Sequence, residues 1–244
     1  MTFEYPKLAE TVQRCRLSNG LEIVVVSKPY HAKSYAVFAT RYGGMDLRFQ
    51  LDGQWQDTPA GIAHYLEHKM FDLPGDRDVT AELAALGAGT NAFTSYDMTA
   101  YYFSCTEGFE DCLRLLLEFV STPYFTEETV QKEQGIIGQE IDMNRDNPDT
   151  QIFEMLMENM YESHPIRVPI LGTSETIREI TPEILALAGG AGSNRGTGGM
   201  ATKLEAAKYV TDRGIDMYVT IGNKPERIYD ILEGKETGTH FFAQ

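Results

Sequence analysis

The stretch Gly61-Ile62-Ala63-His64-Tyr65-Leu66-Glu67-His68-Lys69-Met70-Phe71 carries two histidines and a glutamate in the order H-x-x-E-H. On a helix, residues four apart lie on one face, so His64 and His68 would face the same way with Glu67 beside them. Two neutral imidazoles can bind zinc, and a neighbouring glutamate can accept a proton from a metal-activated water. The motif predicts a metal site. The alternative is a solvated helix face with two incidental histidines.

The composition limits the classes of partner. The chain has 244 residues, 42% of them hydrophobic, which is enough for one large domain or two small ones with a sizeable core. Its formal net charge is −15 and its sequence pI is about 4.7. Nucleic acids and anionic membrane surfaces are bound by clustered Lys and Arg, so we expect neither as a partner.

The cellular compartment is indicated by two features, the first residues of the chain and the spacing of its cysteines. Residues 1–10 contain no apolar run after a basic stretch, and no apolar segment approaches membrane-spanning length. The three cysteines, Cys15, Cys105 and Cys112, lack C-x-x-C spacing and are best interpreted as small core residues of a reduced protein. We therefore expect a cytoplasmic protein.

The patterning predicts an α+β fold, with an antiparallel or mixed sheet and helices packed on it. Residues 21–26 follow a Ser18-Asn19-Gly20 turn signal and read as a strand, which we expect to pair with a second strand at 34–42 as an opening hairpin. Two more strands, 90–96 and 98–104, should be joined tightly at Asp97. Helices are predicted at about 59–71, 79–86, 109–120, 126–145 and 147–161.

The chain changes character after residue 185. A glycine-rich loop at 189–199 precedes a predicted helix at 200–213, a strand at 215–221 and a last helix at 225–232. This part is predicted to be a short α/β fragment.

The third metal ligand must come from far away in the sequence, because a catalytic zinc usually has three protein ligands and an open position. His31 and His164 lie in loop or strand contexts without a partnering residue. Glu133 and Glu140 are better candidates, because a long helix would fix their positions on one face. They could equally form a solvated acidic face, and spacing alone leaves the choice open.

The segment from about Leu17 to Glu183 resembles the insulinase/pitrilysin family of zinc metallopeptidases. The matching stretches are Gly61 to Phe71, Asn91-Ala92-Phe93-Thr94, Lys132-Glu133-Gln134-Gly135-Ile136-Ile137-Gly138-Gln139-Glu140-Ile141, His164-Pro165 and Leu171-Gly172-Thr173. Most members of that family have phenylalanine at the position of Tyr65, a mild change in a buried aromatic residue. The interval from His68 to Glu140, 72 positions, is near the family's usual distance.

This resemblance implies a cofactor, a reaction and a set of site residues. It implies zinc bound by His64, His68 and Glu140, and peptide-bond hydrolysis with Glu67 as the general base. Glu133 matches a second catalytic-site carboxylate that supports the ligands. Asn91, Ala92 and Phe93 match the strand on which the family holds an extended peptide or small protein substrate by strand addition.

Residues 186–244 resemble a different family, the glutamate 5-kinases of proline biosynthesis. The match runs from Gly192 to Ala207 and continues through Ile231-Leu232-Glu233-Gly234. It implies contacts with ATP, because backbone amides at a helix N-terminus can bind phosphate and a lysine adds charge. The implied residues are Thr197, Gly198, Gly199, Met200, Ala201, Thr202 and Lys203. The alternative is a flexible linker.

We therefore predict an incomplete metallopeptidase domain at residues 1–184 and a kinase-like fragment at 185–244. Members of the first family continue for roughly another domain's length, about 100–200 residues, past the point matching Glu183. We expect a truncated zinc metallopeptidase that is poorly active alone and is completed by a second subunit. The alternative hypotheses are an ATP-binding relative of glutamate 5-kinase and a non-catalytic partner subunit.

Overall fold

The computed structural model describes residues 1–51, 53–189, 211, 214, 216–219, 231 and 239–242. The predicted ATP-contacting residues, Thr197 to Lys203, lie outside the described part of the chain. So does nearly all of the two helices predicted at 200–213 and 225–232.

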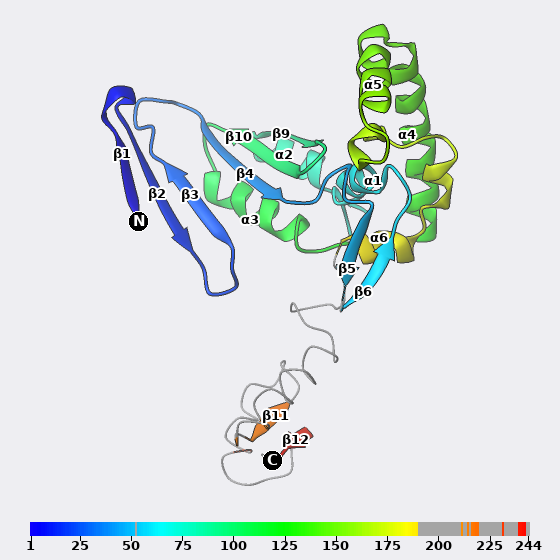
Figure 1. The fold of residues 1–244 in the computed structure, drawn as a ribbon. Helices are drawn as coiled ribbons and strands as arrows, with labels where there is room; N and C mark the ends of the chain where they lie inside the picture. Colours follow the sequence, from blue (N-terminus) through cyan, green and yellow to red (C-terminus); the bar gives the residue numbers. More distant parts are fainter. Residues whose placement is uncertain are drawn as a thin grey trace.

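The described residues form an α+β fold in which the five helices predicted between residues 59 and 161 are present (Figure 1). The helices are α1 (Ile62–Lys69), α2 (Val79–Ala85), α3 (Phe109–Phe119), α4 (Glu127–Asp146), α5 (Pro148–Met160) and α6 (Pro182–Ala188). Three short 3-10 helices lie at Pro6–Leu8, Pro165–Arg167 and Thr176–Glu179. No helix in the described part of the chain is both long and apolar enough to cross a membrane.

The strands form several small sheets, and every described strand pair is antiparallel. The strands are β1 (Thr2–Tyr5), β2 (Glu10–Arg16), β3 (Glu22–Val26), β4 (Ser34–Thr40), β5 (Arg48–Leu51), β6 (Gln54–Asp57), β7 (Asp72–Leu73), β8 (Arg77–Asp78), β9 (Gly89–Thr94), β10 (Thr99–Cys105), β11 (Met217–Val219) and β12 (Thr239–Phe241). The sheet that positions the site has the order β4-β10-β9, so β9 is an edge strand. Helices α1, α2 and α3 pack against it (Figure 1).

The predicted pairing of the first two strands is wrong. Strand β3 pairs with β2, and β4 pairs with the distant strand β10. The turn signal at Ser18-Asn19-Gly20 closes the β2–β3 hairpin, where Gly20 has φ of 91° and its N–H donates to Leu17 O. The signal therefore marks the end of a strand that comes before it as well as the start of the one after it. A turn fixes the partner of a strand only on the side that the turn closes.

Helix α4 begins where the sequence predicts. The Thr126 hydroxyl accepts a hydrogen bond from Thr129 N at 3.2 Å, and Glu127 and Glu128 occupy the first turn. The next helix, α5, is capped by Asn147, whose side chain accepts from Asp149 N at 3.0 Å. Asn147 is therefore the N-cap of α5, with its side-chain oxygen accepting from the backbone of the first helical turn.

Helix α1 begins at a tight backbone contact. Gly61 has φ of 94°, and a Cβ atom there would lie 2.5 Å from Leu171 O. Gly172 has φ of 70°, and a Cβ atom there would lie 2.3 Å from Ala60 O. Only glycine suits both positions, because each needs a left-handed conformation and the close approach of another backbone. The segment before α1 is thereby joined to the Leu171-Gly172 segment, 110 residues later.

The predicted junction near residue 184 lies inside a packed helix. Leu185 on α6 is fully buried in the same core as Ile62 and Leu66 of α1. The α6 helix packs on α1, so the fold of the front part extends to at least residue 188. The boundary between the two predicted domains stays a prediction. Farther on, β11 falls within the predicted strand 215–221 and pairs with β12.

We predict that Gly61→Ala destabilises the protein far more than Gly20→Ala. The two glycines have nearly the same φ, 94° and 91°, but a Cβ atom at Gly20 meets nothing within 4 Å. Both substitutions incur the left-handed penalty of about 1–2 kcal/mol, and Gly61→Ala adds an overpacking cost of about 1–3 kcal/mol. Thermal or urea unfolding of the two variants measures the difference. Equal losses would contradict the backbone contact at Leu171.

Candidate metal centre

Helix α1 presents His64, Glu67 and His68 on one side, as the spacing predicts. The helix is almost entirely internal: His64 is 6% exposed and Glu67 is 8% exposed. The two imidazole ring centroids are 4.6 Å apart. The interpretation as a solvated helix face is therefore wrong, because these polar side chains are buried and need partners inside the protein.

Glu140 on α4 reaches both histidines. Its Oε2 atom lies 3.6 Å from His64 Nε2 and 3.6 Å from His68 Nε2. One ligand atom from each of the three residues lies within 4.8 Å of the other two. The structure thus resolves the choice that spacing left open: Glu140, rather than Glu133, faces the Nε2 atoms of both histidines.

Glu133 supports the cluster from behind. Its Oε1 atom lies 2.8 Å from His68 Nδ1, on the opposite side of the ring from Nε2. A carboxylate at Nδ1 favours a proton there and leaves the Nε2 lone pair free for a metal. Burial alone would lower the pKa of His68. The hydrogen bond and charge of Glu133, with the charges of Glu140 and Glu67, outweigh burial, so the pKa of His68 is raised.

His64 is in a less polar environment. Burial, with a smaller effect of the neighbouring His68, lowers the pKa of His64 to about 3. The ring is therefore neutral, as a metal ligand must be. Its Nδ1 atom is buried and has no hydrogen-bond partner among the described residues.

The donor set fits zinc. Two imidazole nitrogens and one carboxylate oxygen are a usual ligand set of catalytic zinc sites, which keep a fourth position open. The partial exposure of the His68 and Glu140 side chains, 24% and 35%, leaves the cluster accessible from one side. A neutral His64 and a His68 ring oriented by Glu133 are the properties that zinc ligands need.

Glu67 points to the same region without belonging to the ligand cluster. Burial raises the pKa of the Glu67 carboxyl, and the hydrogen bond from Thr94 opposes this effect. Thr94 Oγ1 donates to Glu67 Oε2 at 2.5 Å. A buried carboxylate beside a metal site, with a raised pKa, has the properties of a general base.

Thr94 is not among the site residues predicted from the sequence, and neither is Thr99, which lies opposite it on β10. Thr94 ended the matching stretch Asn91-Ala92-Phe93-Thr94, so the signal was present. Alternation along a strand could have separated its residues, because Thr94 lies on the face of Ala92, while Asn91 and Phe93 lie on the other.

The predicted substrate residues lie on the edge strand β9. Asn91 is exposed and Phe93 is 46% exposed, whereas Ala92 packs against the core. Strand β9 pairs with β10 on one side, and α1 lies beside it. The weaker candidate ligands take no part in the cluster: His31 is exposed, and His164 Nδ1 accepts from Ile166 N at 3.2 Å.

Tyr65 connects the two helices that supply the ligands. Its hydroxyl donates to Val130 O on α4 at 2.5 Å, and the side chain is fully buried. A phenylalanine in this place would pack similarly but would lack this hydrogen bond.

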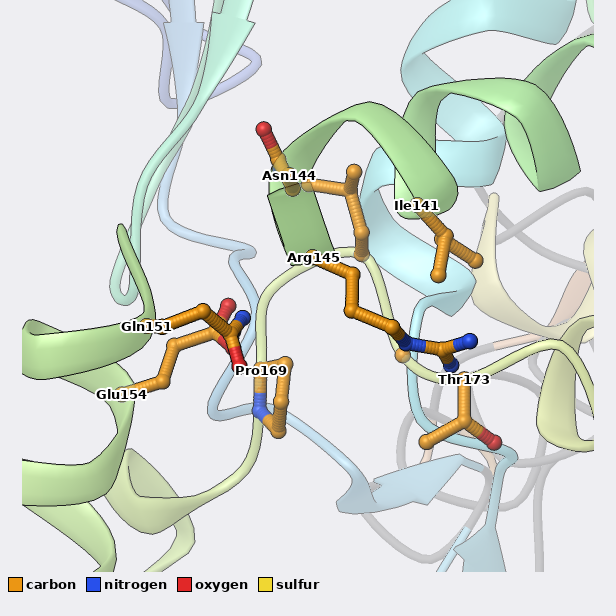
Figure 2. A pocket seen from close by; sticks show the side chains of 9 residues that line it. Ile141, Asn144, Arg145, Gln151, Glu154, Pro169 and Thr173 are labelled. Carbon is orange, nitrogen blue, oxygen red and sulfur yellow. Dashed lines mark hydrogen bonds between the residues drawn. The ribbon is translucent and has the colours of Figure 1, made fainter. Parts of the chain in front are cut away.

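A pocket of about 180 Å³ lies just beyond Glu140, between the end of α4, the start of α5 and the segment at 169–173 (Figure 2). It is lined by Ile141, Asn144, Arg145, Gln151, Glu154, Pro169, Leu171, Gly172 and Thr173. The Arg145 guanidinium extends toward Thr173, with Gln151 and Glu154 on the other side. None of the cluster residues lines this pocket, so the metal centre is identified by its side-chain chemistry and not by a cavity.

Comparison with known proteins assigns the family. The model of the insulinase family, peptidase family M16, matches residues 52–174. The chain belongs to this family. The matched residues contain all of α1 to α5, and therefore His64, Glu67, His68, Glu133 and Glu140.

Similar proteins of known sequence and structure support the same family assignment. The uncharacterized zinc protease YmfH of Bacillus subtilis is 49% identical over 184 residues, which cover 75% of this chain and 43% of YmfH. An M16-like peptidase from Alicyclobacillus acidocaldarius has a similar crystal structure, with a TM-score of 0.72 and 45% identity over 78% of this chain and 44% of that one. The chain thus spans less than half the length of these M16 relatives.

The resemblance to a second family is also present. The glutamate 5-kinase of Clostridium perfringens is 49% identical over 98 residues, 40% of this chain and 36% of the kinase. The chain therefore joins an M16 portion to a portion similar to part of that kinase.

We predict that Glu133→Gln weakens zinc binding by about 10–100-fold, the usual cost of losing a carboxylate behind a histidine ligand. The amide keeps the shape of the side chain but loses the charge that favours the Nδ1 proton of His68. Competition with a chromogenic chelator measures the affinity. Glu128→Gln is the matched control, since Glu128 is exposed on the first turn of the same helix. Equal affinities for both variants would contradict the support of His68 by Glu133.

Proposed function

We propose that this chain binds zinc through His64, His68 and Glu140 and hydrolyses peptide bonds, with Glu67 as the general base. The observation that carries the proposal is the convergence of the three ligand atoms within 4.8 Å of one another, with the Glu67 carboxyl buried on the same helix face. Membership of a peptidase family and similarity to zinc proteases support it.

The bound zinc would supply a Lewis acid that polarises a water molecule and the scissile carbonyl. The residues of the chain supply the proton transfers. Glu67 accepts the proton of the attacking water, for which its raised pKa is suited, and returns it to the nitrogen of the leaving amine. Glu133 holds the His68 ring in the orientation that presents Nε2 to the ion.

The substrate we propose is an extended peptide or small protein segment. Strand β9 is an edge strand beside α1, and an edge strand offers unpaired backbone groups to an added strand. Asn91 and Phe93 present their side chains on its exposed face, and Thr94 contacts Glu67 at its end. A peptide added at this edge would pass the ligand cluster.

We also propose that a second polypeptide completes the site. The M16 relatives are more than twice as long as the part that this chain covers. A second subunit would enclose the substrate, which excludes water and strengthens the interactions in the site.

The similarity to glutamate 5-kinase favours a second candidate function, the binding of ATP at Thr197 to Lys203. A lysine after a glycine-rich loop is suited to phosphate. The chain covers only 36% of the kinase, so phosphotransfer is not part of the proposal.

We predict that Glu67→Gln retains stoichiometric zinc and lowers hydrolysis of fluorogenic peptides by about 100- to 10,000-fold, the usual contribution of a general base. Glu140→Gln should lose both the hydrolysis and the zinc, because it removes the anionic ligand. Metal analysis beside the peptide assay separates the two effects. Undiminished hydrolysis in Glu67→Gln would defeat the assigned base. Protein without zinc would defeat the proposal, and zinc without turnover would favour the non-catalytic subunit.

A matching experiment tests the second candidate. If the segment binds nucleotide, ATP with magnesium raises the Tm of the chain, and the shift disappears in Lys203→Ala. Differential scanning fluorimetry measures both. No shift at millimolar ATP would exclude this function for the chain.

A further inference from the structure

The Glu67 carboxylate is buried, and its orientation therefore depends on the groups that contact it. Thr94 Oγ1 donates to Glu67 Oε2 at 2.5 Å across the contact between β9 and α1. A hydrogen bond to a charged acceptor is stronger and more directional than one between neutral groups. Thr94 belongs to neither the ligand cluster nor the exposed face of β9.

The position of the Thr94 hydroxyl proton follows from its neighbour. Thr99 is the residue opposite Thr94 in the β9–β10 register, and the two Oγ1 atoms are 3.4 Å apart. Thr99 donates its single hydroxyl proton to Tyr42 O at 2.8 Å. Its lone pairs face Thr94, so Thr99 does not compete to donate to Thr94, and the Thr94 proton is directed to Glu67.

The backbone that carries Thr94 is also fixed. The turn after it, Ser95 to Met98, lies against Gly43, where a Cβ atom would come within 2.6 Å of Asp97 N. Gly44 N donates to Ser95 O at 2.9 Å. This turn and the adjacent Tyr42 carbonyl therefore hold both threonines in place, and through Thr94 they hold the carboxylate.

From these contacts we infer that Thr94 is a positioning residue that fixes the Glu67 carboxylate toward the His64, His68 and Glu140 cluster. The inference rests on the proposed function for its catalytic meaning, but the contact itself exists independently of turnover. Thr94 acts through Glu67 and touches neither the metal ligands nor the reacting atoms.

A hydroxyl suits this task better than an amide or a carbonyl group. It donates to the Glu67 carboxylate before the reaction, and it can accept a hydrogen bond from the carboxyl group after Glu67 has taken up a proton. In the second case the Thr94 proton turns toward Thr99 Oγ1, 3.4 Å away. The side chain of Glu67 can therefore keep one orientation while its proton comes and goes.

The test compares Thr94→Val, which has the same shape without the hydroxyl, with Thr94→Ser, which keeps it. Crystal structures of the full chain should show Glu67 rotated or in several rotamers in Thr94→Val and in its original place in Thr94→Ser. Thr90→Val is the matched control, because Thr90 lies on the same face of β9 and donates a hydrogen bond to Tyr102 O at 2.9 Å, away from Glu67. An unmoved Glu67 in Thr94→Val would overturn the inference.

Kinetics and metal analysis provide the second readout. We expect Thr94→Val to keep its zinc and its KM while kcat falls by about 100-fold, as for a catalytic group misplaced by about 1 Å. Thr94→Ser should recover most of that loss, and Thr90→Val should show none of it. A loss of kcat that Ser does not rescue would overturn the inference. Rotation of Glu67 in a chain that lacks peptidase activity would instead leave the inference standing and count against the proposed function.

Discussion

Helix α1 carries polar side chains into the interior of the protein, and three of them are held by partners from other elements of the fold. His68 is paired with Glu133, Glu67 with Thr94, and the fully buried Lys69 with Asp72 on β7. These partners come from α4, β9 and β7, whereas α6 and β10 also contact α1 but supply none of the three. A buried charge left unpaired would cost several kcal/mol. The polar side chains of this short helix therefore constrain where α4, β9 and β7 can lie.

The residues of the site that lie on one helix could be predicted from the sequence. The contacts between α1 and residues on α4 or β9 could not. Helical periodicity places His64, Glu67 and His68 together, because their separation is fixed by local geometry. Glu133 and Glu140 lie on one helix and are chemically alike, so only their resemblance to a family, and then their distances to the histidines, distinguish them. Thr94 carries no charge and lies on a strand, where its partner is set by tertiary packing.

The sheet illustrates the same limit. The β9–β10 hairpin was predicted correctly because its turn lies between its two strands. The pairing of β4 with β10 joins residues that are 59 (Thr40 and Thr99) to 71 (Ser34 and Cys105) positions apart, and no local signal marks it. Likewise, the sequence shows Gly61 and Leu171-Gly172 as two separate motifs. Only the structure shows that the backbone at Gly61 contacts the backbone at Leu171.

The three carboxylates of the centre have a consequence for folding. Glu67, Glu133 and Glu140 gather around two imidazoles, so without a cation the α1 and α4 helices hold like charges close together. A divalent ion taken up by His64, His68 and Glu140 would relieve that repulsion and join positions 68 and 140, closing a loop of 72 residues. Such a cross-link restricts the unfolded chain in the way a disulfide does. The ion would then cross-link the two helices as well as act as a Lewis acid.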